Sequence, residues 1–197
     1  MAREKVLLFD LGGVLVQSEG LACLERIVSP EERHLVPARW HESRAVRLFE
    51  TGKTSPEEFA VAFIEEWRLS MAPDRFLELF ASWVSGFFAG AESLLARLRA
   101  RHRVAYLSNT NAVHFARLPQ LATVFDCGFA SHISGHMKPS PEAYQGAVSA
   151  LGVDPTSVYF FDDLDANVLA ARVLGMQAVQ VRGVAEVEAA LRAHELV

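Results

Sequence analysis

A run of four apolar residues, Val6 to Phe9, forms the first hydrophobic segment of the chain and ends at Asp10. Uninterrupted apolar runs of this length are typical of strands buried on both faces, the kind found in parallel sheets. Gly12 and Gly13 follow, and glycine lets the backbone approach a ligand closely. Because open parallel sheets bind ligands beyond the carboxyl ends of their strands, the pattern predicts a functional group at Asp10.

Short apolar segments followed by polar side chains recur after residue 90, where they alternate with helical patterns. The predicted strands cover 104–107, 125–130, 158–161 and 178–181, and the predicted helices cover 92–100, 141–151, 165–174 and 184–193. Strands that alternate with helices predict an α/β fold, a Rossmann-like parallel sheet flanked by helices on both faces.

Residues 17–90 differ, because their apolar residues recur at helical spacing with no strand signal. Ser55, Pro56 and Glu58 have the order of an N-cap, an N1 proline and a capping box, and aromatic residues follow at four-residue intervals. We therefore expect an inserted helical bundle of about four helices with an aromatic core. Gly52-Lys53-Thr54 is interpreted as an interhelix turn and not a P-loop, because Arg47 stands where a P-loop needs glycine.

Composition narrows the class of protein. The 197 residues are 51% hydrophobic and 22% charged with a net charge of −5, which is ordinary for a globular protein and disfavours nucleic-acid binding. Cys23 and Cys127 are too few for a disulfide framework, so we expect reduced cysteines and a cytoplasmic protein. No apolar run is long enough for a membrane span, and we expect no membrane partner.

Four groups of polar residues follow the predicted core segments: Asp10, Ser108, Lys138, and the pair Asp162 and Asp163. Parallel topology would bring them to one edge of the sheet. The three carboxylates suit Mg²⁺, while a hydroxyl, backbone N–H groups and an ammonium suit a phosphate. An aspartate beside a metal can also act as a nucleophile that forms an acyl phosphate.

The chain resembles the haloacid dehalogenase-like superfamily, which is dominated by Mg²⁺-dependent phosphatases with an aspartate nucleophile. Counterparts of its four motifs occur in order: Phe9-Asp10-Leu11-Gly12-Gly13-Val14, Leu107-Ser108-Asn109-Thr110-Asn111, Met137-Lys138-Pro139, and Phe161-Asp162-Asp163-Leu164-Asp165-Ala166-Asn167. The resemblance implies an α/β core domain from 1–16 and 88–197 and a helical cap domain from 17–87.

The resemblance also implies a role for each matched residue. Asp10 would be the nucleophile and a metal ligand, and Lys138 would neutralise charge on it and on the phosphate. Ser108, Asn109 and the backbone of Gly12 and Gly13 would bind the phosphoryl group. The metal ligands would be Asp10, the Gly12 carbonyl, Asp162 and Asp163, with Asn167 as the supporting residue of that loop.

Gly12 departs from the family pattern, in which phosphatases usually carry a second aspartate two residues after the nucleophile. Proton transfer by such a group is worth about 10²–10⁴-fold in rate. The chain is also similar to a bacterial subgroup with Asp-Leu-Gly-Asn in the first motif, which includes α-D-glucose-1-phosphate phosphatases; here Gly13 replaces the Asn. Three histidines, His136, His132 and His41, could replace the missing acid and base, and we consider His136 first.

The leading hypothesis is therefore a Mg²⁺-dependent phosphohydrolase, acting on phosphoric monoesters of a small metabolite such as a sugar phosphate through an aspartyl phosphate on Asp10. The first alternative is a metal-independent haloacid dehalogenase, which the acidic pair Asp162 and Asp163 disfavours. The second, motivated by Gly12, is a catalytically weak protein that binds phosphate and Mg²⁺. An exposed aromatic face on the cap would allow two chains to pair as a homodimer.

Overall fold

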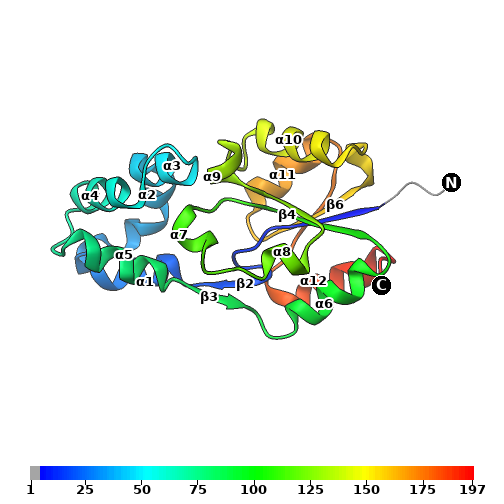
Figure 1. The fold of residues 1–197 in the computed structure, drawn as a ribbon, viewed down its shortest axis with the longest axis horizontal. Coiled ribbons are helices and arrows are strands. Elements are labelled where there is room, and N and C mark those ends of the chain that lie inside the picture. Colours follow the sequence, from blue (N-terminus) through cyan, green and yellow to red (C-terminus); the bar gives the residue numbers. More distant parts are fainter. Residues whose placement is uncertain (1–4) are drawn as a thin grey trace.

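The computed structural model describes residues 5–197, and a sheet of five parallel strands lies at its centre (Figure 1). The strand order is β5-β4-β1-β6-β7, with every neighbouring pair parallel. The strands are β1 (Val6–Phe9), β4 (Arg103–Ser108), β5 (Cys127–Ala130), β6 (Val158–Asp162) and β7 (Gln177–Gln180). The predicted α/β fold is confirmed, and all five strands coincide with predicted ones to within a few residues.

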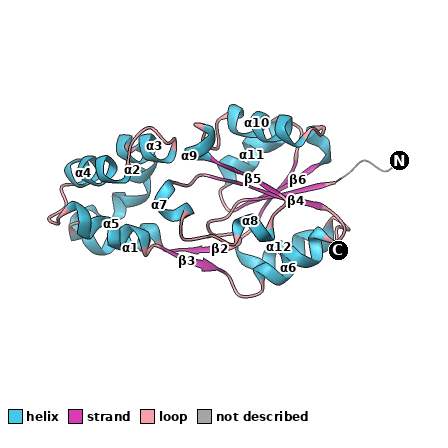
Figure 2. Cartoon of the chain, in the orientation of Figure 1, coloured by secondary structure: helices cyan, strands magenta, loops and turns pink. Residues whose placement is uncertain are grey.

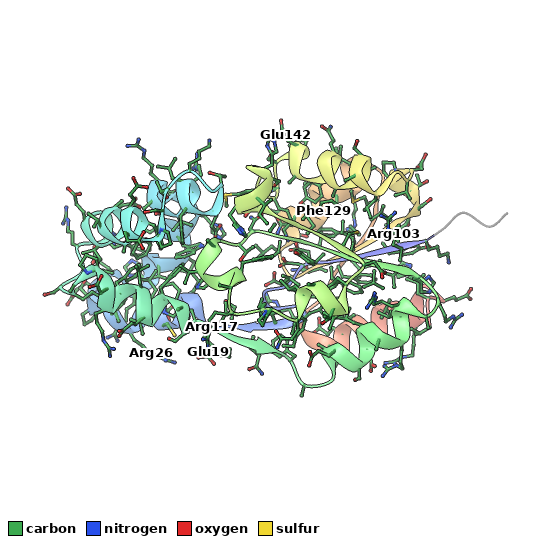
Figure 3. The ribbon with its side chains drawn as sticks, viewed as in Figure 1. Glu19, Arg26, Arg103, Arg117, Phe129 and Glu142 are labelled. Carbon is green, nitrogen blue, oxygen red and sulfur yellow. The ribbon has the colours of Figure 1, made fainter. Side chains whose placement is uncertain are left out.

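Both faces of this sheet are covered by helices, which explains why β1 is apolar at every position. Leu7 and Phe9 pack on one helix layer, and Val6 and Leu8 pack on the other. The first layer contains α6 (Ala91–Arg99), α8 (Leu121–Val124) and α12 (Gly183–Ala193), and the second contains α10 (Pro141–Leu151) and α11 (Asp165–Val173). Figure 3 shows Phe129 of β5 within the second layer's side-chain packing. None of the helices within 5–197 has the length and apolar composition needed to cross a membrane.

The inserted segment packs around an apolar cluster of its own, set apart from the sheet (Figure 2). Aromatic rings dominate this cluster, and Phe49 stacks on Phe59 with 4.3 Å between ring centroids. Ser55 forms the predicted capping box with Glu58. The helices are α1 (Gly20–Ile27), α2 (Val36–Glu42), α3 (Arg44–Glu50), α4 (Pro56–Trp67) and α5 (Pro73–Ala81), with a 3₁₀ turn at Pro30–Leu35. The division into core and cap domains stays a prediction.

The expectation that residues 17–90 are helical throughout is wrong at both ends. Strand β2 (Val16–Ser18) pairs antiparallel with β3 (Val84–Phe87), and this small ribbon connects the inserted helices to the sheet. Each strand has one buried residue, Val16 in β2 and Val84 in β3. Strands this short give no alternating pattern, and their pairing joins segments almost seventy positions apart, so a local pattern could not predict them.

Two smaller differences lie on the connections that follow β4 and β5, and a third lies in the inserted segment. The sequence predicts one helix after Ser108, whereas the structure has two short ones, α7 (Ala112–Phe115) and α8, with Pro119 between them. The sequence predicts a loop before Lys138, whereas the structure has the short helix α9 (Ser131–Ser134) there. The inserted segment has five α-helices where about four were expected. The four-residue helices α7, α8 and α9 are held by tertiary contacts, because helices this short have little stability of their own.

Two glycines, Gly128 beside a side chain of the first layer and Gly146 on the exposed side of α10, test the packing around the sheet. A Cβ on Gly128 would lie 1.9 Å from Cε1 of Tyr106, its register partner on β4, whereas a Cβ on Gly146 of α10 would meet nothing within 4 Å. We expect Gly128→Ala to lower the free energy of unfolding by about 1–3 kcal/mol through overpacking. Gly146→Ala should raise it by about 0.5–1 kcal/mol, because alanine favours helix. Urea titration measures both, and an unchanged Gly128→Ala midpoint would contradict this packing.

Candidate active site

The site is organised around the buried ammonium group of Lys138. Its Nζ lies 2.8 Å from Oδ1 of Asp10 and 2.6 Å from Oδ2 of Asp162, and its side chain is 1% exposed. Asn109 holds the lysine backbone through two hydrogen bonds: the Lys138 N–H donates to Asn109 Oδ1, and Asn109 Nδ2 donates to the Lys138 carbonyl, both at 2.8 Å. One cation therefore joins residues from three separate motifs.

Sheet topology brings the two aspartates together. Strands β1 and β6 are parallel neighbours, with Phe9 opposite Phe161, so Asp10 and Asp162 leave the sheet at the same edge. The backbone N–H of Asp10 continues the ladder by donating to the Phe161 carbonyl at 2.8 Å. Both carboxylates thus have positions set by the sheet and not by a loop.

Asp162 is fixed by further hydrogen bonds from the start of α11. Nδ2 of Asn167 donates to both of its carboxylate oxygens, at 2.9 and 3.1 Å, and the backbone N–H of Leu164 donates to Oδ1 at 2.9 Å. The Tyr144 hydroxyl in turn donates to the Asn167 carbonyl at 3.0 Å. Asn167 therefore holds the Asp162 carboxylate in one orientation.

A third carboxylate completes an acidic cluster. Asp10, Asp162 and Asp163 each offer an oxygen, and these oxygens all lie within 4.8 Å of one another. Gly13 borders the cluster with a left-handed backbone (φ 73°), and a Cβ there would lie 2.9 Å from Oδ2 of Asp163. Glycine at this position thus serves both the turn and the close approach to Asp163.

Burial and charge act against each other within the cluster. Burial raises the pKa of Asp10 to about 6, although Lys138 offsets part of the shift. Burial and the neighbouring Asp162 also raise the pKa of Asp163. Burial would lower the pKa of Lys138, but Asp10 and Asp162 outweigh it and raise that pKa above its ordinary value. A site with this excess of buried carboxylate favours a bound cation.

The donor set fits Mg²⁺, which is the cofactor we assign to it. Mg²⁺ binds hard oxygen ligands and commonly uses one or two carboxylates together with water and substrate oxygens. The three acidic residues supply such oxygens, and 12% exposure of the Asp10 side chain leaves it open to a ligand. A site for a soft metal would instead need thiolate or imidazole ligands.

Two predicted phosphate-binding positions lie at the same edge of the sheet. Ser108 ends β4 beside β1 and is 4% exposed, and its hydroxyl makes no hydrogen bond with the rest of 5–197. Gly12 follows β1, with open space beside its Cα: the nearest atom to a Cβ there is Ser18 Cβ at 4.0 Å. Both positions are therefore available to a ligand.

The histidine considered first as a substitute acid faces elsewhere. His136 is exposed, and its charge acts on Glu142 at the start of α10. Figure 3 shows Glu142 at the outer surface of the molecule. His41 is exposed on α2, and burial lowers the pKa of His132 on α9.

Sequence reasoning missed a different titratable residue. Glu50, the last residue of α3, is only 8% exposed, and its carboxyl group interacts electrostatically with Asp10 and Lys138. The sequence predicts that Glu50 is part of the interhelix turn that contains Gly52-Lys53-Thr54. The one local signal is its position two residues before Gly52, at a tight turn with φ 69°.

Lys138 can be tested as the group that balances the buried carboxylates. Without metal, we expect Lys138→Met to lower the free energy of unfolding by about 3–5 kcal/mol at pH 8, because Asp10 and Asp162 lose their buried partner. The loss should shrink at pH 5: removal of Lys138 raises the pKa of Asp10 beyond about 6, so that carboxyl is neutral there. Denaturant titration in chelator measures both values.

Exposed Lys53 supplies the matched control, since Lys53→Met removes a charge with no buried partner. An equal loss of stability for Lys138→Met at pH 5 and pH 8 would contradict the electrostatic account.

Comparison with known proteins agrees with this geometry. Residues 4–175 match the family of haloacid dehalogenase-like hydrolases. A phosphatase of Mycobacterium tuberculosis is 35% identical over 136 residues, which is 66% of this chain and 63% of that protein. The chain therefore spans less than two thirds of that relative's length.

Two further comparisons cover most of both chains. D-ribitol-5-phosphate phosphatase of Bacteroides thetaiotaomicron is 25% identical over 194 residues, 89% of this chain and 91% of that protein. A haloacid dehalogenase-family enzyme of the same organism has been solved with magnesium and inorganic phosphate, and it superposes on this chain with a TM-score of 0.75 at 23% identity. The superposition covers 91% of this chain and 94% of that one, and it shows that the two share a fold. The chain belongs to the family of haloacid dehalogenase-like hydrolases.

Proposed function

We propose that the protein is a Mg²⁺-dependent phosphatase that hydrolyses a small phosphorylated metabolite, in particular a sugar phosphate. The observation that carries the proposal is the Lys138 ammonium held between Asp10 and Asp162, with a third carboxylate beside them. Phosphoryl transfer depends mainly on positioning and charge neutralisation, which such a site supplies. The similarity to D-ribitol-5-phosphate phosphatase supports the substrate class.

The proposed reaction has two displacements at phosphorus. An oxygen of Asp10 attacks the phosphorus atom, the bond to the metabolite oxygen breaks, and an aspartyl phosphate forms. Water then attacks the same phosphorus atom and releases inorganic phosphate and the Asp10 carboxylate. Lys138 neutralises charge on the nucleophile, while the Ser108 hydroxyl, Asn109 and the backbone N–H groups of Gly12 and Gly13 hold the phosphoryl oxygens.

The metal ligands would be Asp10, the Gly12 carbonyl and Asp162, with Asp163 acting directly or through water. Mg²⁺, when bound, neutralises charge on the phosphoryl oxygens. Asp162 can serve this purpose because Asn167 and Leu164 hold its carboxylate in one orientation. Asp163 lies against the Gly13 turn, which places it beside the first motif.

Two alternatives make different demands on the same residues. A haloacid dehalogenase would use Asp10 to attack carbon and would have no need for three converging carboxylates. A protein that only binds phosphate and Mg²⁺ would keep the whole cluster but show no turnover, and the missing side chain at Gly12 is the observation that favours it.

Phosphate release tests the proposal against both alternatives. With Mg²⁺ we expect turnover of hexose 1- and 6-phosphates, nucleotides or p-nitrophenyl phosphate, and its loss in chelator. Asp10→Asn should lower the rate by about 10³-fold or more, because it removes the nucleophile. Exposed Asp165 is the matched control, and Asp165→Asn should keep the wild-type rate. Halide release without Mg²⁺, or no turnover even of the aryl ester, would contradict the proposal.

Metal binding can be measured without turnover. Mg²⁺ at a hundred times its dissociation constant should stabilise the fold by about 2.7 kcal/mol, seen as a rise in Tm. The rise should shrink as the pH falls from 7 to 5, because protons compete for Asp10, whose pKa is about 6. Asp163→Asn should weaken the effect and Asp165→Asn should not. A Tm that ignores Mg²⁺ at every pH would contradict the metal site.

A further inference from the structure

At Gly12 the proposed reaction lacks the side chain that would act as acid toward the leaving group and as base toward water. The oxygen that leaves phosphorus needs a proton unless it is a stable anion, and the attacking water must lose one. Glycine has no side chain to transfer protons. Lys138 is paired with Asp10 and Asp162, and Asp162 and Asp163 are the proposed metal ligands. None of these four residues is free to transfer this proton, so we consider a donor outside the four motifs.

Glu50 is a carboxyl group in the inserted helices that reaches the charges of this site. It is 8% exposed, and its carboxyl oxygens make no hydrogen bond within residues 5–197. Both charged groups that act on it, Asp10 and Lys138, belong to the site. These oxygens are not among the fully enclosed polar atoms of residues 5–197 that lack a partner, so the carboxyl group is largely buried but keeps some contact with solvent.

The position of Glu50 is set by close contact between the inserted helices and the sheet domain. Helix α3 packs against α9, the short helix that precedes Lys138. At the turn after α3, a Cβ on Gly52 would lie 2.1 Å from the carbonyl oxygen of His132 on α9. Phe49, the residue before Glu50, is buried and stacks on Phe59 in the aromatic cluster. The end of α3 that carries Glu50 is thus held from both sides.

The charge environment of Glu50 suits proton transfer. Burial, with a smaller contribution from the charge of Asp10, raises its pKa to about 7, although Lys138 offsets part of the shift. A group with a pKa near the working pH can both give and take a proton. On the neighbouring helices, Glu66 of α4 accepts a hydrogen bond from the Ala45 N–H at the opposite end of α3, and burial lowers the pKa of His132 of α9.

We propose that Glu50 is the general acid and base of the reaction and supplies from the inserted helices the proton transfer that Gly12 cannot perform. This inference rests on the proposed phosphatase function. It adds a catalytic residue outside the four motifs and joins the two parts of the chain in one active site.

The proton moves in a closed cycle. While Asp10 forms its bond to phosphorus, the P–O bond to the metabolite breaks and the departing oxygen takes the Glu50 proton to become an alcohol. The Glu50 carboxylate then takes a proton from the water that attacks the aspartyl phosphate. The Asp10–phosphorus bond breaks, inorganic phosphate leaves, and Glu50 is protonated again.

The test compares wild type with Glu50→Gln on substituted phenyl phosphates that range from p-nitrophenyl to unsubstituted phenyl phosphate. We expect little change in kcat/KM for the p-nitrophenyl ester, because its leaving group needs no proton. For phenyl phosphate we expect kcat/KM to fall by ~10²-fold or more, because general acid catalysis is usually worth ~10²–10⁴-fold. For the p-nitrophenyl ester kcat should still fall, with phosphorylated enzyme accumulating, because the second step has lost its base.

Glutamine has nearly the same shape as glutamate, so the variant should keep the fold and its Mg²⁺-dependent rise in Tm. Glu57→Gln, at an exposed position on α4, is the matched control and should leave every rate unchanged. Because a Cβ at position 12 has 4.0 Å of clearance, Gly12→Asp can be added to Glu50→Gln, and recovery on phenyl phosphate would support the inference.

An equal loss of kcat/KM on all esters in Glu50→Gln would overturn the inference while leaving the phosphatase intact, because it would indicate a positional role. A wild-type protein that releases no phosphate with Mg²⁺ would overturn the proposed function itself, and the role of Glu50 with it.

Discussion

The buried ion pairs of Lys138 with Asp10 and Asp162 are the interaction on which the rest of the site depends. Burying one ammonium and two carboxylates is costly unless each has a partner, so the three side chains must be placed together by the fold. Parallel pairing of β1 with β6 supplies the two aspartates at one edge, and Asn109 at the end of β4 holds the lysine backbone. The net negative charge that remains is what a divalent cation would balance.

The inserted helices extend this site from outside the sheet. Their aromatic cluster is separate from the two apolar layers that cover the sheet, which makes them a stable platform. The turn at Gly52 lies against the backbone of α9, and the same end of α3 carries Glu50. Proton transfer by Glu50 on the inserted helices and nucleophilic attack by Asp10 on the sheet would divide the chemistry between two structural units. A change in the contact between α3 and α9 would then affect proton transfer more than metal binding.

Much of this arrangement could be predicted from local pattern. Asp10 and Asp162 end apolar runs that the structure confirms as strands, and parallel topology was enough to expect them at one edge. The ribbon of β2 and β3 escaped prediction because each strand buries one residue and its partner is remote in sequence. Glu50 escaped for a related reason: its burial comes from the docking of α3 on α9, and a single glutamate at a helix end has no pattern that distinguishes it from a solvated one.

The central claim is that Asp10 carries the phosphoryl group during turnover, and acid quenching in the first turnover tests it most directly. Wild-type protein mixed with Mg²⁺ and p-nitrophenyl phosphate would be quenched, digested, and analysed by mass spectrometry. The account predicts the added mass of one phosphoryl group on the peptide that contains Asp10, and its disappearance as turnover proceeds. Phosphate release with no modified peptide at any quench time would contradict the account, because it would mean that water attacks the substrate directly.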